Sequence, residues 1–312
     1  MSVIQGLPTR GDVSTPVVLT IGTFDGVHLG HRSLLDRVIA DAGREHGISV
    51  VITFDPHPRC VVDPGGCPPM LTGVDERVEL LRGSGVESIV LLPFSRELST
   101  WTAERFCNAL TDAFPIRRLV TGPGFAVGHR RAGDLDFLRA YGAAHGFDVV
   151  TVEPLTRGAA VVSSSRIRDA LLDGRLDEAN NLLGRRYELS GAVVHGTGTG
   201  KGLGFPTINL DVDPGRCVPA TGVYAAWCDV AGQRYPAASS IGFRPTFGGD
   251  TLSVEAHLLD VAGDLYGSRA TLSFVHRLRE EIAYPSAEAL IEQMTRDVEQ
   301  VRSFLAATPT SP

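Results

Sequence analysis

A strand, a turn and a helix near the start of the chain constrain its fold most. The run 17–21 is apolar throughout, which is typical of a buried parallel strand, and 33–39 carries apolar residues at helical spacing. The stretch 22–31 therefore connects a strand to a helix. We expect His28 and His31 at or just before the helix N-terminus, where backbone N–H groups attract anions.

The residue types of this turn suit phosphate chemistry. Its glycines let the backbone approach a ligand closely, and the imidazoles of His28 and His31 can donate to phosphate oxygens. Such donors match the charge that builds on a phosphorus under in-line attack, so the turn predicts nucleotidyl transfer. The alternative is an ordinary helix start with two incidental histidines. A zinc site is less favoured, because no third ligand stands at the spacing of a zinc helix motif.

Apolar and amphipathic segments alternate as far as residue 152. The expected strands are 49–54, 88–92, 119–121 and 147–152, and the expected helices are 75–81, 103–110 and 135–144. This alternation predicts a doubly wound, Rossmann-like α/β domain with a parallel sheet, whose ligands bind at the carboxyl ends of the strands. Pro56 and Pro58 end one strand in a rigid loop at that edge.

The pattern changes after Arg185. Short alternating runs separated by Gly, Pro and Asp turns predict an antiparallel β-barrel or sandwich; they are 187–195, 222–230, 253–260 and 270–274. The segment 286–304 is expected to be a closing helix that packs one apolar stripe on the barrel. The stripe comprises Ala287, Leu290, Ile291, Met294, Val298, Val301 and Phe304. We therefore expect two domains, 1–185 and 186–312.

Composition excludes several classes of protein. The 312 residues suffice for two cores, and the net charge of −7 argues against a nucleic-acid-binding surface. The sequence has no apolar run long enough for a membrane span, which predicts a cytoplasmic protein without a membrane partner. The five cysteines are odd in number and form no C-x-x-C pair. They predict a reduced compartment rather than a disulfide framework.

A run of hydroxyls and arginines opens the helix expected at 167–172. Ser164 and Ser165 can cap this helix, and Arg166 and Arg168 place two guanidiniums around the same small volume. Together they would hold a pyrophosphate leaving group. Taken alone, the run is more typical of helix capping.

The loop 196–209 is rich in glycine and carries Lys201, the only lysine of the chain. It fits neither a Walker A motif nor a Rossmann fingerprint, because no Lys-Ser or Lys-Thr pair follows the right gap and strand-like residues come next. Its backbone N–H groups can still cradle phosphate, while oxygens of Thr207 and Asn209 suit Mg²⁺. The expected ATP contacts are Gly200, Lys201 and Gly202. The alternative is a flexible hairpin loop.

Glu255 is the candidate base of the second domain. Alternation puts Ser253, Glu255 and His257 on one face of a strand, opposite a face formed by Leu252, Val254, Ala256 and Leu258. A carboxylate on the open face of a barrel can take the proton from a substrate hydroxyl. The alternative is a solvated surface glutamate.

Seven motifs carry a family resemblance over nearly the whole chain. They are GTFDGVHLGH at 22–31, TFDPHP at 53–58, SSSRIR at 163–168, GFPTIN at 204–209, GVY at 222–224, RPTFG at 244–248 and VEAH at 254–257. In this order they resemble the bacterial bifunctional riboflavin kinase/FAD synthetase family. The resemblance implies an N-terminal FMN adenylyltransferase of the nucleotidyltransferase superfamily and a C-terminal riboflavin kinase barrel. It also implies riboflavin, FMN and ATP as ligands and Mg²⁺ as the metal.

The resemblance implies a role for each matching residue. His28, His31 and Arg166 would be catalytic in the first domain, with ATP and pyrophosphate contacts from Gly22, Phe24, Gly30, Ser164, Ser165 and Arg168. In the kinase, Lys201 and its glycines would cradle ATP, Thr207 and Asn209 would ligate Mg²⁺, and Glu255 would be the base for the ribityl hydroxyl. The expected flavin contacts are Pro56, Pro58, Phe106 and Phe125.

The chain departs from the family pattern at two places. Where the family has Asp or Asn, then Phe, any residue, Phe and Gly, this chain has Gly-Phe-Ala-Val-Gly at 124–128. A polar group at Gly124 and a flavin-stacking ring at Val127 are therefore missing. Ser240 stands where the family often has Asn. These departures keep open a paralogue with an active kinase, whose first domain uses another acceptor or nucleotide or is a non-catalytic module.

Overall fold

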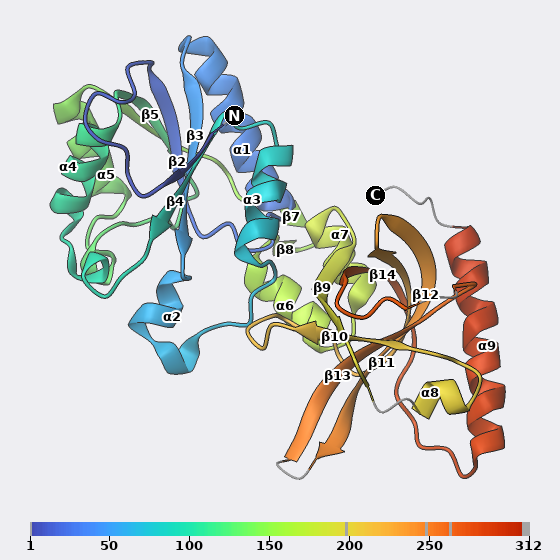
Figure 1. Cartoon of the computed structure of the whole chain (residues 1–312). Helices are drawn as coiled ribbons and strands as arrows, with labels where there is room; N and C mark the ends of the chain where they lie inside the picture. Colours follow the sequence, from blue (N-terminus) through green and yellow to red (C-terminus); the bar gives the residue numbers. More distant parts are fainter. Residues whose placement is uncertain (1, 197–198, 247–248, 262–263, 308–312) are drawn as a thin grey trace. The chain divides into compact units, whose positions relative to one another are not determined.

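The computed structural model describes residues 2–196, 199–246, 249–261 and 264–307. The chain divides into two compact units, 1–164 and 165–312 (Figure 1). Among the described residues, no helix has the length and apolar character needed to cross a membrane.

The first unit contains a parallel sheet of six strands in the order β1-β4-β3-β2-β5-β6. The strands are β1 (Ser2–Gln5), β2 (Val17–Ile21), β3 (Ile48–Asp55), β4 (Ser88–Pro93), β5 (Ile116–Thr121) and β6 (Asp148–Thr151). The predicted α/β fold is confirmed. Sequence reasoning missed β1, because this short edge strand is mostly exposed and lacks an apolar run.

Helices cover both faces of this sheet. They are α1 (Leu29–Arg44), α2 (Pro58–Val62), α3 (Val74–Gly83), α4 (Ala103–Ala113) and α5 (Leu135–His145), with short 3-10 turns at Pro64–Gly66, Leu98–Thr100 and His129–Arg131. One core cluster joins the sheet to α4 and α5 through residues such as Leu19, Phe106 and Leu138. Another cluster joins the opposite face to α1 and α3 through Leu35 and Leu81. A small hairpin, β7 (Thr156–Arg157) and β8 (Ala160–Val161), follows the sheet.

One pair of cysteines contradicts the expectation that the cysteines form no disulfide framework. Cys60 in α2 and Cys67 form a disulfide, with Cα atoms 4.3 Å apart. The short helix α2 and the 3-10 turn Pro64–Gly66 fold the chain back between them, which the spacing of the cysteines did not indicate. The other cysteines, Cys107, Cys217 and Cys228, are buried. Burial raises the pKa of Cys107 to about 11, so this thiol stays protonated.

The second unit contains a closed antiparallel barrel of six strands in the order β10-β13-β12-β11-β14-β9. The strands are β9 (Tyr187–Val194), β10 (Ile208–Val212), β11 (Gly222–Val230), β12 (Gln233–Thr246), β13 (Gly249–Leu258) and β14 (Arg269–Arg279). The predicted barrel is confirmed. Sequence reasoning missed β10, which is only five residues long, and β12, where glycine, proline and serine residues interrupt the apolar alternation.

Two helices precede the barrel and belong to its unit. They are α6 (Ser164–Leu172) and α7 (Leu176–Leu183). The amide N–H of Ala220 donates to the carbonyl oxygen of Leu171 at 2.9 Å, and Asn180 Nδ2 donates to the carbonyl oxygen of Phe274 at 3.0 Å. These bonds join α6 and α7 to the rest of the second compact unit, and the domain boundary expected near Arg185 stays a prediction.

The last helix, α9 (Ala287–Ala306), packs beside the barrel as predicted (Figure 1). Ser286 caps its first turn by accepting from the amide of Ala289 at 3.3 Å. The buried stripe ends differently from the expected one, since Leu305 is buried while Phe304 is 39% exposed. The ring of Phe304 stacks on His276 at 4.4 Å instead.

Candidate functional sites

The histidine turn between β2 and α1 has the geometry that its sequence predicted. His28 is the N-cap of α1, and its Nδ1 accepts from the backbone N–H of His31 at 3.2 Å. The two imidazole rings are stacked, with centroids 3.6 Å apart and planes inclined by 15°. His28 is 5% exposed. The rings are thus held in fixed orientations at a helix N-terminus, which is suited to binding anions.

The backbone of this turn is unusual. Phe24 and Val27 have positive φ angles of 48° and 37°, although both are buried non-glycine residues. Such conformations cost free energy and persist only where the surroundings enforce them. The turn is also closely packed at Gly30, where a Cβ would lie 3.2 Å from both the His28 ring and the carbonyl oxygen of Val162.

Asp25 holds the turn in place, although sequence reasoning gave it no role. Its side chain is fully buried and accepts from the backbone N–H groups of Leu71 and Thr72, each at 3.1 Å. Thr72 Oγ1 also accepts from the amide of Gly26 at 3.1 Å. The hydroxyl of Ser164 donates to the Asp25 carbonyl oxygen at 2.8 Å. The position of Asp25 inside the motif was the available signal.

The serine and arginine run lies partly outside the first unit. Ser165, Arg166 and Arg168 open α6 in the second unit, where Arg168 is buried and Ser165 is exposed. The Nε of Arg166 donates to Glu178 Oε1 at 3.0 Å. Hydrogen bonding from Arg166 and the charge of Arg175 lower the pKa of Glu178, against the opposing effect of desolvation. The pyrophosphate-binding role of the run stays a prediction.

Gly124 and Val127, where the chain departs from the family pattern, have different surroundings in the structure. Nothing lies within 4 Å of a Cβ placed on Gly124, so this position opens to free space. Val127 is 6% exposed, belongs to the core under α4, and exchanges two backbone hydrogen bonds with Gly133. The side chain of Val127 packs in the core, and the interpretation of position 127 as a missing flavin-stacking face stays a prediction.

The expected flavin contacts of the first unit differ in their exposure. Phe106 is only 6% exposed and lies in the core, so its ring presents little surface to a ligand. Phe125 is partly buried against the same core. Pro56 is exposed after a cis Asp55–Pro56 bond, and Pro58 begins α2. Phe125, Pro56 and Pro58 are thus the more accessible candidates.

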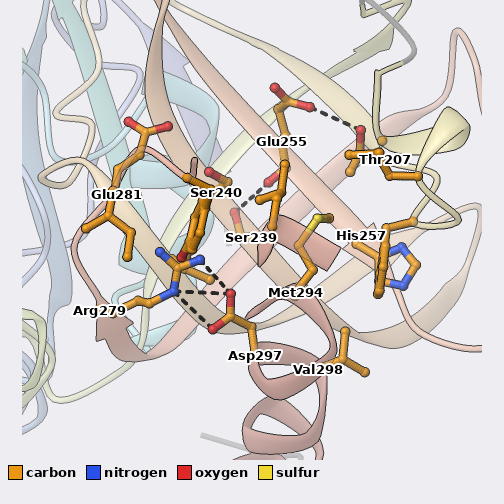
Figure 2. Close-up of a pocket in the computed structure, with 18 residues that line it drawn as sticks. Thr207, Ser239, Ser240, Glu255, His257, Arg279, Glu281, Met294, Asp297 and Val298 are labelled. Atoms are coloured by element: carbon orange, nitrogen blue, oxygen red, sulfur yellow. Dashed lines mark hydrogen bonds and ion pairs between the residues drawn. The ribbon is translucent and has the colours of Figure 1, made fainter. Parts of the chain in front are cut away.

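A cavity of about 230 Å³ opens in the barrel unit (Figure 2). Its polar lining includes Thr207, Ser239, Ser240 and Glu255, and its apolar lining includes Met294 and Val298 of α9. The hydroxyl of Thr207 donates to Glu255 Oε2 at 3.1 Å. A flat apolar ligand with a polar tail matches such a lining.

Strand register brings the predicted metal ligands and base together. Asn209 on β10 is the pairing partner of Glu255 on β13, and Ser240 on β12 is the partner of Glu255 on its other side. Strand pairing therefore places Asn209 opposite Glu255, and the hydroxyl of Thr207, just before β10, bonds the Glu255 carboxylate. Hard oxygen donors of this kind fit Mg²⁺. No cluster of three His, Cys, Asp or Glu that could bind a metal occurs among the described residues.

The glycine-rich loop contains a helical turn, α8 (Thr199–Gly202), between the paired strands β9 and β10. Gly200 lines the cavity, and its carbonyl oxygen accepts from the amides of Leu203 and Phe205 at 3.1 and 2.8 Å. A Cβ on Gly200 would lie 2.5 Å from the Phe205 carbonyl oxygen, so a side chain is excluded there. The side chain of Lys201 lies outside the described part.

An ion pair that sequence reasoning missed forms another wall of the cavity. Arg279 of β14 binds Asp297 of α9, with Nη2 and Oδ2 2.7 Å apart (Figure 2). Asp297 is 4% exposed and also accepts from Gln293 Nε2 at 2.8 Å. Its hydrogen bond raises the pKa of Arg279 above the usual value. The pair therefore fixes α9 against the barrel beside the cavity.

Comparisons with known proteins match both units. A family model described as riboflavin kinase covers residues 183–305, and one described as FAD synthetase covers 12–166. A bifunctional riboflavin kinase/FMN adenylyltransferase from Pseudomonas fluorescens is 37% identical over 98% of this chain and 98% of that protein. The chain belongs to this family. The protein of the same description from Escherichia coli (strain K12) is 36% identical over 93% of each chain.

A solved structure confirms the fold of the family member. The chain described as a macrolide-efflux protein from Streptococcus pneumoniae matches with a TM-score of 0.87 and 30% sequence identity. The match covers 96% of this chain and 98% of that one. The likeness therefore extends over both units.

Proposed function

We propose that this family member phosphorylates riboflavin to FMN in its barrel unit and adenylylates FMN to FAD in its α/β unit. The observation that carries the kinase assignment is the hydrogen bond from Thr207 to Glu255 beside the cavity, with Asn209 paired opposite Glu255 in the barrel. The stacked His28 and His31 at the N-terminus of α1 support the adenylyltransferase assignment.

In the kinase, Glu255 is the proposed general base. Its carboxylate accepts the proton of the ribityl hydroxyl as that oxygen attacks the γ-phosphorus of ATP and ADP leaves. Thr207 donates to one carboxylate oxygen and so orients the other. Thr207 and Asn209 would hold Mg²⁺, which neutralises charge on the phosphates. Gly200 lines the cavity and is a proposed backbone contact of the ATP phosphates.

In the adenylyltransferase, an oxygen of the FMN phosphate attacks the α-phosphorus of ATP, and pyrophosphate leaves. No hydroxyl proton has to be removed, since the FMN phosphate is already an anion. His28 and His31 therefore act as donors to the developing phosphorus charge rather than as bases. The exposed loop of Pro56 and Pro58 is the proposed flavin contact.

Incubation with riboflavin, ATP and Mg²⁺, followed by separation of riboflavin, FMN and FAD, tests the proposal. We expect FMN and then FAD. FMN without FAD would support the alternative of a first unit with another acceptor or nucleotide, which the match of both family models does not favour. No FMN would overturn the kinase assignment. A cytoplasmic location, and the lack of nucleic-acid and membrane partners, stay sequence-based expectations.

A further inference from the structure

A buried arginine under the histidine turn has no part in the chemistry described so far. Arg77 lies on α3 and is only 2% exposed. Its Nη1 donates to the carbonyl oxygen of Thr23 at 3.1 Å, and its Nη2 donates to the carbonyl oxygen of Phe54 at 2.8 Å. One guanidinium thus binds two backbone segments that are far apart in sequence.

These two carbonyls stand at the functional edge of the sheet. Thr23 follows β2 and belongs to the turn that carries His28, while Phe54 is the residue before Asp55 at the end of β3. The strands β2 and β3 are parallel neighbours whose mutual pairing ends at Ile21 and Ile52, so Thr23 and Phe54 both lie beyond the last residues that these two strands pair. Thr53 Oγ1 also donates to the Thr23 carbonyl oxygen, at 3.0 Å.

The charge of Arg77 suits this position. Burial lowers its pKa, whereas the charges of Asp25 and Asp55 raise it, and an arginine stays protonated under such conditions. The buried cation offsets the partial negative charge of strand-end carbonyls where phosphate anions are proposed to bind. The planar fork of arginine reaches two acceptors at once, which a lysine ammonium on one flexible stem does less well.

We propose that Arg77 is a positioning residue for adenylyl transfer, which fixes the ATP-binding turn relative to the flavin-binding loop. This inference rests on the proposed function of the first unit. In this proposal Arg77 contacts neither ATP nor FMN. Its role is to set the distance between the turn with His28 and the loop with Pro56. Misplacement of reactants by about 1 Å can lower a rate by about a hundredfold, so such a constraint has kinetic consequences.

The test compares Arg77→Met and Arg77→Lys with a matched control, Arg82→Met. Arg82 lies on the same helix, with a side chain 45% exposed and paired to Glu79. Steady-state kcat and KM for FMN and ATP are measured for FAD formation, at a temperature where circular dichroism shows each variant folded. Riboflavin phosphorylation by the same preparations is the internal control, because the barrel belongs to the other unit.

We expect Arg77→Met to lower kcat for FAD formation by about tenfold to a hundredfold and to raise KM for FMN, with FMN formation unchanged. The kcat and KM of Arg77→Lys should lie between those of Arg77→Met and those of the unsubstituted protein. The values of Arg82→Met should match those of the unsubstituted protein. A purely structural role would lower kcat in proportion to the folded fraction and leave both KM values unchanged, which would overturn the inference. So would unchanged kinetics in folded Arg77→Met. If the unsubstituted protein forms no FAD, the proposed adenylyltransferase function fails as well.

Discussion

At the scale of single residues, the two sites fix their reactive groups in different ways. In the α/β unit, His28 is 5% exposed and stacks on His31, so the imidazoles are oriented before a ligand arrives. In the barrel, Glu255 stands beside a cavity and is oriented by one hydrogen bond from Thr207. The first arrangement suits donation to a phosphate, and the second suits removal of a proton.

The role of Glu255 can be isolated with Glu255→Gln. This change keeps the size of the side chain and its hydrogen bond to Thr207 but removes the proton acceptor. FMN formation should fall by about a hundredfold to ten-thousandfold, while FAD formation from supplied FMN stays the same. Near-normal phosphorylation of riboflavin by Glu255→Gln would refute the assignment.

The proposed metal ligands can be tested by titration. Thr207→Val and Asn209→Ala should each raise the Mg²⁺ concentration needed for half-maximal FMN formation, because each removes an oxygen donor. Ser190→Ala is a control, since Ser190 is also on a barrel strand but bonds Thr271 at 2.8 Å. An unchanged Mg²⁺ titration in the two ligand variants would remove them from the metal site.

Substituting the residues typical of the family at positions 124 and 127 should affect the stability of the protein differently. A Cβ placed on Gly124 meets no atom within 4 Å, so Gly124→Asp should leave thermal stability unchanged and raise FAD formation by adding a polar contact. Val127→Phe places a larger side chain in a filled core, where Val127 Cγ2 already lies 2.9 Å from a Cβ placed on Gly133. It should lower the free energy of unfolding by about 1–3 kcal/mol. Equal stability of the two variants, from chemical denaturation, would contradict this account of the loop.

At the scale of elements, charged side chains as well as apolar ones connect helices to strands. In the first unit, the fully buried carboxylate of Asp41 on α1 binds Arg37 at 2.8 Å and Arg118 of β5 at 3.1 Å. Burial alone would raise the pKa of Asp41, but the hydrogen bonds from Arg37 and Arg118 outweigh it and lower the pKa. In the second unit, Arg279 and Asp297 connect β14 to α9 in the same way.

The Asp41 network predicts a pH dependence of stability. A carboxylate whose pKa is lower in the folded state stabilises the fold above its unfolded pKa of about 4, and the contribution is lost as the pH falls through the folded pKa. Asp41→Asn should therefore lower the free energy of unfolding by about 1–3 kcal/mol at pH 7 and flatten its decline below about pH 5. Asp36→Asn, on the exposed side of the same helix, is the control. The free energy of unfolding is measured by urea denaturation at each pH. If it changes with pH in parallel for Asp41→Asn and the unsubstituted protein, this role of Asp41 is contradicted.

At the scale of the whole molecule, the chain contains two units whose division differs from the one that the composition suggests. The compact barrel unit begins at Ser165 and includes α6 and α7, whereas the family models end at residue 166 and resume at 183. In α7, Leu182 and Leu183 are buried, and Asn180 Oδ1 accepts from the amide of Tyr187 at 2.7 Å. These helices therefore contribute to the core of the barrel unit.

Two truncated chains test this division. Residues 165–312 should fold cooperatively and convert riboflavin to FMN. Residues 186–312 lack the buried leucines of α7 and the bonds of Asn180, so they should melt at a lower temperature or aggregate. Equal melting temperatures of the two fragments, by circular dichroism, would show that the barrel unit begins after α7.

The sequence by itself determined the two fold classes and supplied the candidate site residues. Apolar periodicity is a local property, so it predicted the strand-turn-helix of the histidine turn and the alternating strands of the barrel. The register of β10, β13 and β12, which the sequence did not predict, makes Asn209 and Ser240 the pairing partners of Glu255. Residue types and order within motifs were sufficient for the predictions of fold class and candidate residues.

Only the tertiary structure decided contacts between residues far apart in the chain. It placed Phe106 and Val127 in the core, joined Cys60 to Cys67, and paired Arg279 with Asp297. It also brought Arg77 to the ends of both β2 and β3. Periodicity indicates that a side chain is buried but not what it meets, because the partner is set by how elements pack. The roles of these residues follow from that packing.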